Sequence, residues 1–146
     1  MLVIALMAAS AFGVYRAAHD GRFRGTRSVQ AGDPGEFSAT ERGAGVLEGS
    51  GFAHELGERA TLLQFSSAFC APCRATRRIL GDVARVVPGV VHLEVDAEQH
   101  LELVRRLGIL RTPTTVILDR NGVEVSRASG APRKEQVLAT LAEALG

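Results

Sequence analysis

Hydrophobic and polar positions divide the chain into three parts. Residues 1–19 begin with an uncharged apolar run, MLVIALMAASAFGVY, and residues 20–45 are rich in glycine and polar side chains with little apolar periodicity. Residues 46–146 carry the patterns of regular secondary structure. The chain is long enough for one ordinary domain and a smaller appendage. We therefore expect an apolar N-terminal helix, a flexible linker and one folded domain.

Strand-like and helix-like patterns alternate within the folded part. A strand is predicted over residues 60–67. Apolar residues at helical spacing follow it and predict a helix that ends at Pro88 and Gly89. Further strands are predicted at 90–95, 114–119 and 123–129, with helices at 101–107 and from Pro132 onward. An Asn-Gly pair at 121–122 predicts a hairpin turn between the last two strands. The predicted order is β-α-β-α-β-β-α, an α/β fold, with a short strand near Val46 and a helix over 51–56 ahead of it.

Composition narrows the class of protein. The chain is 46% apolar and 23% charged, with a net charge of +1. These values are typical of a globular protein and argue against a disordered chain or a polyanion-binding protein, so nucleic acid is not an expected partner. Two cysteines cannot form the multiple disulfides of a small secreted scaffold, so any special role for them must come from chemistry at one place.

The N-terminal run predicts contact with a membrane. Its 15 residues would form a helix about 22 Å long, short of the roughly 30 Å hydrocarbon core of a bilayer. Four arginines follow it, at 16, 22, 24 and 27, against only Asp20. We expect a single-pass anchor that leaves the folded domain in the cytoplasm, because basic flanks stay on that side. The alternatives are a buried helix, a reversed anchor, or a cleavable signal peptide cut near Ala9–Ala11, the last two placing the domain outside the cytoplasm.

The two cysteines lie three residues apart at the predicted strand-to-helix turn. Cys70 falls where the strand ends and Cys73 lies one turn into the helix, with Pro72 in the first turn, where its missing N–H costs nothing. A helix N-terminus stabilises a thiolate, so Cys70 is the predicted nucleophile. Cys73, further inside the helix, is the predicted resolving thiol.

Other roles for the pair fit less well. A structural zinc site needs four ligands, and the histidines are scattered. Haem attachment needs histidine directly after the second cysteine, where Arg74 stands. A purely structural disulfide across so short a loop would remove little entropy from the unfolded chain. A redox centre is the favoured interpretation, with no metal and no cofactor expected.

Two motifs resemble a known family. FCAPCR, residues 69–74, resembles the WCGPCK active site of thioredoxins, and RTPTTVILDRNG, residues 111–122, is similar to the cis-proline loop and hairpin of that family. The resemblance implies the thioredoxin fold, a central mixed sheet flanked by helices, and a cis peptide between Thr112 and Pro113. It also implies exchange with protein disulfide or dithiol substrates and an upstream thiol electron donor.

The sequence departs from the thioredoxin pattern beside the active site. Phe69 replaces the usual tryptophan and Ala71 the usual glycine. Gln64 stands where the family has a buried acid, and His92 aligns with the lysine partner of that acid. His92 could accept the proton of Cys73 if it points toward that thiol; the alternative is a buried Gln-His hydrogen bond with only a packing role.

The predicted function is thiol-disulfide exchange on protein substrates. Ala-Pro between the cysteines is similar to the Gly-Pro of reducing thioredoxins, so a reductant is favoured. A non-catalytic binding module with this fold is one alternative. A thiol peroxidase is another, because Ser67 lies three residues before Cys70.

Overall fold

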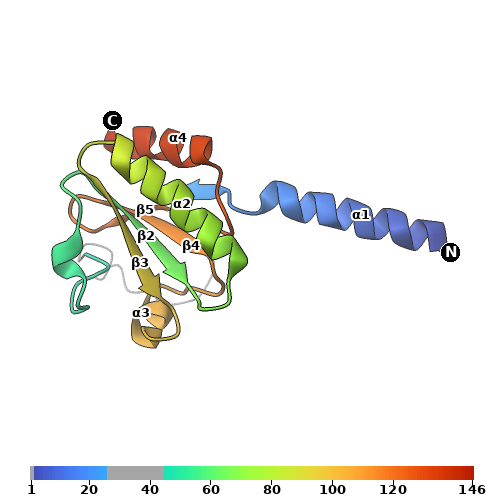
Figure 1. Cartoon of the computed structure of the whole chain (residues 1–146), viewed down its shortest axis with the longest axis horizontal. Coiled ribbons are helices and arrows are strands. Elements are labelled where there is room, and N and C mark those ends of the chain that lie inside the picture. The colour runs from blue at the N-terminus through green and yellow to red at the C-terminus, as the bar shows by residue number, and fades with distance from the viewer. Residues whose placement is uncertain (1, 26–44) are drawn as a thin grey trace, which may run out of the picture.

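The computed structural model describes residues 2–25 and 45–146 (Figure 1). From β2 onward the order of elements is the predicted β-α-β-α-β-β-α, so the α/β prediction is confirmed. The described elements are α1 (Leu2–His19), β1 (Phe23–Gly25), η1 (Ala53–Glu55), β2 (Ala60–Ser66), α2 (Ala71–Val86), β3 (Val90–Asp96), α3 (Leu101–Arg106), β4 (Thr114–Asp119), β5 (Glu124–Ser129) and α4 (Lys134–Leu145).

The strands form one mixed sheet in the order β1-β5-β4-β2-β3. β2 pairs with β3 in parallel and with β4 in antiparallel, and β1 and β5 extend the sheet in antiparallel. All seven residues of β2 are buried because both faces of this strand are covered. Its sequence is accordingly a nearly continuous apolar run rather than an alternating one.

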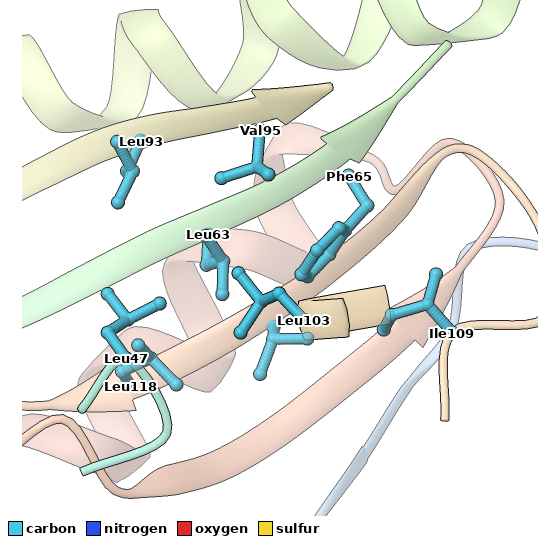
Figure 2. Close-up of a cluster of buried hydrophobic side chains, with 9 residues drawn as sticks. Leu47, Leu63, Phe65, Leu93, Val95, Leu103, Ile109 and Leu118 are labelled. Carbon is cyan, nitrogen blue, oxygen red and sulfur yellow. The ribbon is translucent and has the colours of Figure 1, made fainter. Parts of the chain in front are cut away.

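Helices cover both faces of the sheet. On one face, α2 and α4 pack over a cluster that includes Leu62, Leu80 and Leu141, as Figure 1 shows. On the other, α3 and the segment before β2 close a second cluster around Phe65 and Leu103 (Figure 2). These two clusters anchor β2, whose C-terminal end carries the loop to the cysteines.

The segment before η1 differs from the prediction. A strand was expected near Val46, but residues 46–49 form a turn, and the helix expected over 51–56 is only the short 3-10 helix η1. Glycines at 45, 49 and 51 weaken both strand and helix formation here, and Gly49 has φ of +73°. Leu47 still enters the core and is 1% exposed.

The N-terminal region also differs from the prediction. Residues 20–45 were expected to be linker, but Phe23–Gly25 form the edge strand β1; the predicted linker at 26–44 lies outside the described residues. α1 projects away from the domain (Figure 1). Across residues 2–25 and 45–146, no helix combines the length and apolarity needed to cross a membrane, so the predicted anchor is not confirmed.

Candidate active site

Cys70 and Cys73 form a disulfide at the N-terminus of α2. The sulfur atoms are 2.02 Å apart, and Cys70 is the N-cap of the helix. Pro72 lies in the first turn of α2, where a helix leaves its N–H groups without intrahelical partners. The strand-to-helix turn predicted from the sequence is therefore present, with the pair at its tip.

The two cysteines differ in exposure and in hydrogen bonding. Cys73 is 2% exposed, whereas Cys70 is half-buried. The backbone N–H of Cys73 donates to Cys70 Sγ at 3.1 Å. A donor aimed at this sulfur, together with the positive end of the α2 dipole, stabilises a negative charge on Cys70 once the disulfide is reduced. The neighbouring side chain of Phe69 is fully exposed.

The proline loop packs beside the cysteine turn. The peptide between Thr112 and Pro113 is cis, as the resemblance implied. The hydroxyls of Thr112 and Ser67 are 3.0 Å apart, so this loop contacts the residues just before Cys70. Pro113 O accepts a hydrogen bond from Gly130 N at 2.8 Å, which ties the start of β4 to the end of β5.

Gln64 and His92 form a partly buried hydrogen bond. Gln64 Oε1 lies 3.0 Å from His92 Nε2, and since an amide oxygen can only accept, His92 Nε2 donates. Gln64 Nε2 donates to Ser66 Oγ at 2.8 Å and to the backbone oxygen of Cys73 at 3.0 Å. Among the contacts of the described residues, none joins Gln64 or His92 to the sulfur of Cys73. A proton relay through this pair therefore stays a prediction.

Three further residues extend this network through contacts that the sequence did not predict. Ser66 Oγ donates to Glu94 Oε1 at 2.6 Å, and Arg77 on α2 donates to the same carboxylate, with Nη2 2.8 Å from Oε1. The parallel register pairs Gln64 with Glu94, and residues two apart on a strand share a face. The spacing of His92 and Glu94, two residues apart on β3, could have indicated from the sequence that they share a face. The register that places them beside β2 cannot be read from either segment alone.

Burial and hydrogen bonding shift two pKa values in this network. Burial lowers the pKa of His92, with the Glu94 carboxylate opposing that effect, so the neutral imidazole is favoured. Burial raises the pKa of Glu94, but hydrogen bonds from Arg77 and Ser66 outweigh it and hold that pKa below its usual value. The network therefore contains a neutral imidazole and an ionised carboxylate near neutral pH.

A cavity of about 380 Å³ opens at the cysteines. Both cysteines line it, together with Ser66, Arg77 and Glu94. The hydrogen-bonded carboxylate and the redox pair thus border the same space. Within the described part of the chain, no group of three or more His, Cys, Asp or Glu side chains is placed to hold a metal ion.

Solved structures share this fold. Thioredoxin F from spinach chloroplast superposes with a TM-score of 0.58 at 23% identity, covering 70% of this chain and 91% of that one. Fasciola hepatica thioredoxin superposes with a TM-score of 0.55 at 27% identity, covering 63% and 86%. About a third of this chain lies outside each of these superpositions.

Sequence relatives identify the family. Thioredoxin H-type 1 of Nicotiana tabacum is 31% identical over 78 residues, 53% of this chain and 61% of that protein. The thioredoxin of Alicyclobacillus acidocaldarius is 31% identical over 90 residues, 61% of this chain and 85% of that protein. The family model described as a thioredoxin-like domain matches residues 53–145, more than half of the chain. Together with the fold and the cysteine turn, this match shows that the chain belongs to the thioredoxin-like family.

Proposed function

We propose that this chain is a thiol-disulfide oxidoreductase that reduces disulfides in protein substrates through Cys70 and Cys73. The observation that carries the proposal is the asymmetry of the pair: Cys70 is half-buried and accepts a hydrogen bond from the first turn of α2, whereas Cys73 is buried. An accessible, stabilised thiolate beside a sheltered thiol is the arrangement that sequential exchange requires.

The reaction proceeds in two exchanges. The Cys70 thiolate attacks one sulfur of a substrate disulfide, forming a mixed disulfide and releasing the other substrate sulfur as a thiolate. Cys73, as a thiolate, then attacks Cys70 Sγ, which releases the second substrate sulfur and forms the Cys70–Cys73 disulfide found in the structure. Two electrons pass to the substrate, whose thiolates take up the two protons that the cysteines lost. An upstream thiol donor reduces the pair again.

The direction of exchange is proposed to be reductive. The pair encloses Ala71 and Pro72, and no histidine stands between the cysteines to favour a strongly oxidising couple. A measured potential of about −270 mV would support a reductant, and one of about −120 mV would contradict it, since these values separate reducing from oxidising members of this fold.

Insulin reduction by the full chain tests the proposal. We expect Cys70→Ser to abolish activity because the attacking thiol is lost. Cys73→Ser should abolish turnover but accumulate mixed disulfides, visible as adducts on a non-reducing gel, because only the resolving step is lost. An active Cys70→Ser variant, or a Cys73→Ser variant without adducts, would contradict the assignment. Hydrogen peroxide consumption that exceeds insulin reduction would favour a peroxidase instead.

A further inference from the structure

A second cavity, of about 320 Å³, lies at the β1–β5 side of the sheet and is unusually basic. It is lined by His19, Arg22, Arg24, Arg111, Arg127 and Ser129. These residues include four arginines and, within the described part of the chain, no carboxylate. The cavity is separate from the one at the cysteines, because no residue lines both.

The edge strand β1 gathers these charges on one face. Arg24 in β1 and Arg22 just before the strand both line the cavity. Phe23, between them, packs against the cluster under α2 and α4. The antiparallel register places Arg24 directly opposite Arg127. Like charges in such cross-strand positions repel each other, so a bound anion would reduce the repulsion between Arg24 and Arg127.

The four arginines are not equally neutralised. Arg111 forms an ion pair with Asp20 and donates to Ser129 O at 3.0 Å. Arg127 forms an ion pair with Glu124, with a nitrogen-to-oxygen distance of 2.6 Å.

Arg22 and Arg24, in contrast, are exposed, and neither has an ion-pair partner among the described residues. The cavity thus has two guanidinium groups held in place by carboxylates and two whose charge is available to a ligand.

The cavity adjoins the proline loop. Arg111 immediately precedes Thr112, whose hydroxyl contacts Ser67 near the cysteines. Ser129 is paired in register with Thr114, so the cavity lies at the same end of β4 and β5 as the cis peptide. A chain that reaches Cys70 along this loop would pass the arginines.

We propose that Arg22 and Arg24, supported by Arg111, bind carboxylates of an acidic segment that flanks the disulfide of a protein substrate. The inference rests on the proposed reductase activity and adds a substrate class to it. Guanidinium groups present paired N–H donors that match a carboxylate, and exposed charges of this kind raise the rate of encounter with oppositely charged partners. The site would select acidic substrates over neutral ones before any exchange at Cys70.

Two disulfide-bonded peptides test the inference with the full, reduced chain. They are identical except that one carries Asp and Glu beside the disulfide and the other carries Asn and Gln. We expect kcat/KM to be about fivefold higher for the acidic peptide, as two exposed ion pairs of ordinary strength would produce. The preference should shrink in 0.5 M NaCl because salt screens exposed charges, whose screening length falls to about 3 Å at 1 M.

Variants assign the effect to the cavity. Arg22→Gln combined with Arg24→Gln should remove the preference and leave reduction of the neutral peptide unchanged. Arg120→Gln is the control. It makes the same kind of substitution at an exposed arginine, but at the opposite end of β4 from the cavity.

The outcomes separate the two proposals. Equal rates for both peptides, or a preference that survives the double substitution, would overturn the acidic-substrate inference while the reductase proposal stands. Failure to reduce either peptide, or insulin, would overturn the reductase proposal itself.

Discussion

His92 is half-buried on β3, with its ring held by Gln64 rather than by a thiol. Because burial lowers the pKa of this imidazole, the folded chain binds a proton less readily than the unfolded chain, whose histidine titrates near 6.5. Stability from the neutral ring is therefore fully present above that pH. It is lost as the pH falls from 6.5 toward the lower pKa of the folded state.

We expect His92→Asn to flatten the dependence of unfolding free energy on pH between 7.5 and 5. The contribution of one proton is limited to about 1.4 kcal/mol per pH unit. Urea unfolding of both proteins across this range measures the difference. Titration of Glu94 does not contribute in this pH range, because the pKa of that carboxyl is lowered from 4.5 and its effect on stability lies at lower pH. An unchanged slope in the variant would show that His92 is not the group responsible.

Gln64 tests whether the polar network beside Cys73 has a structural or a catalytic role. Its side chain is fully buried and hydrogen bonds to His92, Ser66 and the backbone of Cys73. Gln64→Leu should cost about 1–3 kcal/mol, because it leaves buried polar groups without partners. Urea unfolding checks the stability, and insulin reduction at a temperature where both proteins are folded checks the activity. Unchanged activity indicates packing; a large loss indicates that the network assists Cys73.

The residues of the candidate site were predictable to different degrees. Cys70, Cys73 and Pro113 belong to short contiguous motifs, so their placement follows from local sequence and family resemblance. The contact of Glu94 with Arg77 was missed because it depends on how β3 aligns with β2 and on which side of α2 meets the sheet. Those relations are set by packing between segments far apart in the chain.

For helices and strands too, the features that depend on distant parts of the chain were the ones not predicted. From β2 onward, strong apolar patterns predicted each strand and helix correctly, because burial of those faces determines the fold. β1 was assigned to the linker, since Phe23 is its only apolar residue and the pairing that stabilises it is with β5, about a hundred residues later. A single apolar residue among glycines and arginines does not indicate a strand until its partner is known.

The attachment of β1 depends on Gly21. Its φ is +73°, and a Cβ added there would lie 2.1 Å from the backbone oxygen of Ala131. Its N–H donates to Ser129 O at 2.7 Å, which begins the pairing with β5. We expect Gly21→Ala to detach β1 at a cost of about 1–2 kcal/mol, which a left-handed conformation imposes on a residue with a side chain.

Hydrogen exchange followed by mass spectrometry checks this, with faster exchange expected in peptides covering residues 20–25. Gly25→Ala is the matched control, because an added Cβ there meets nothing within 4 Å. The Gly21 variant should also lose the preference for acidic peptides while reducing the neutral one normally. Equal protection of β1 in the two variants would mean that Gly21 does not hold the strand.

At the scale of the whole molecule, one end of the sheet carries both cavities and the proline loop. The cysteine turn follows β2, the cis peptide begins β4, and the basic cavity uses the N-terminal strand that lies beyond the family match at residues 53–145. Arg111 and Asp20 form an ion pair although they are 91 residues apart. The part of the chain outside the common family fold therefore contributes to the surface around the active site.

α1 is the remaining unexplained part of the described chain. It projects from the domain, as Figure 1 shows. Its apolar side chains are exposed along its length, including Val3 at 67%, Met7 at 69% and Val14 at 71%. Transfer of apolar surface out of water is favourable, by about 25 cal/mol for each Å² buried. The exposed helix therefore predicts association with lipid.

We expect the full chain to sediment with phosphatidylcholine vesicles and to remain in solution without them. Met7→Glu combined with Val14→Glu should abolish sedimentation, because charged side chains oppose transfer into an apolar phase. Val86→Glu is the control, since it places the same charge at an exposed apolar position on α2, outside α1. Sedimentation without vesicles would indicate self-association through α1 instead. Equal vesicle binding by the α1 variant and the control would contradict a lipid-binding role for this helix.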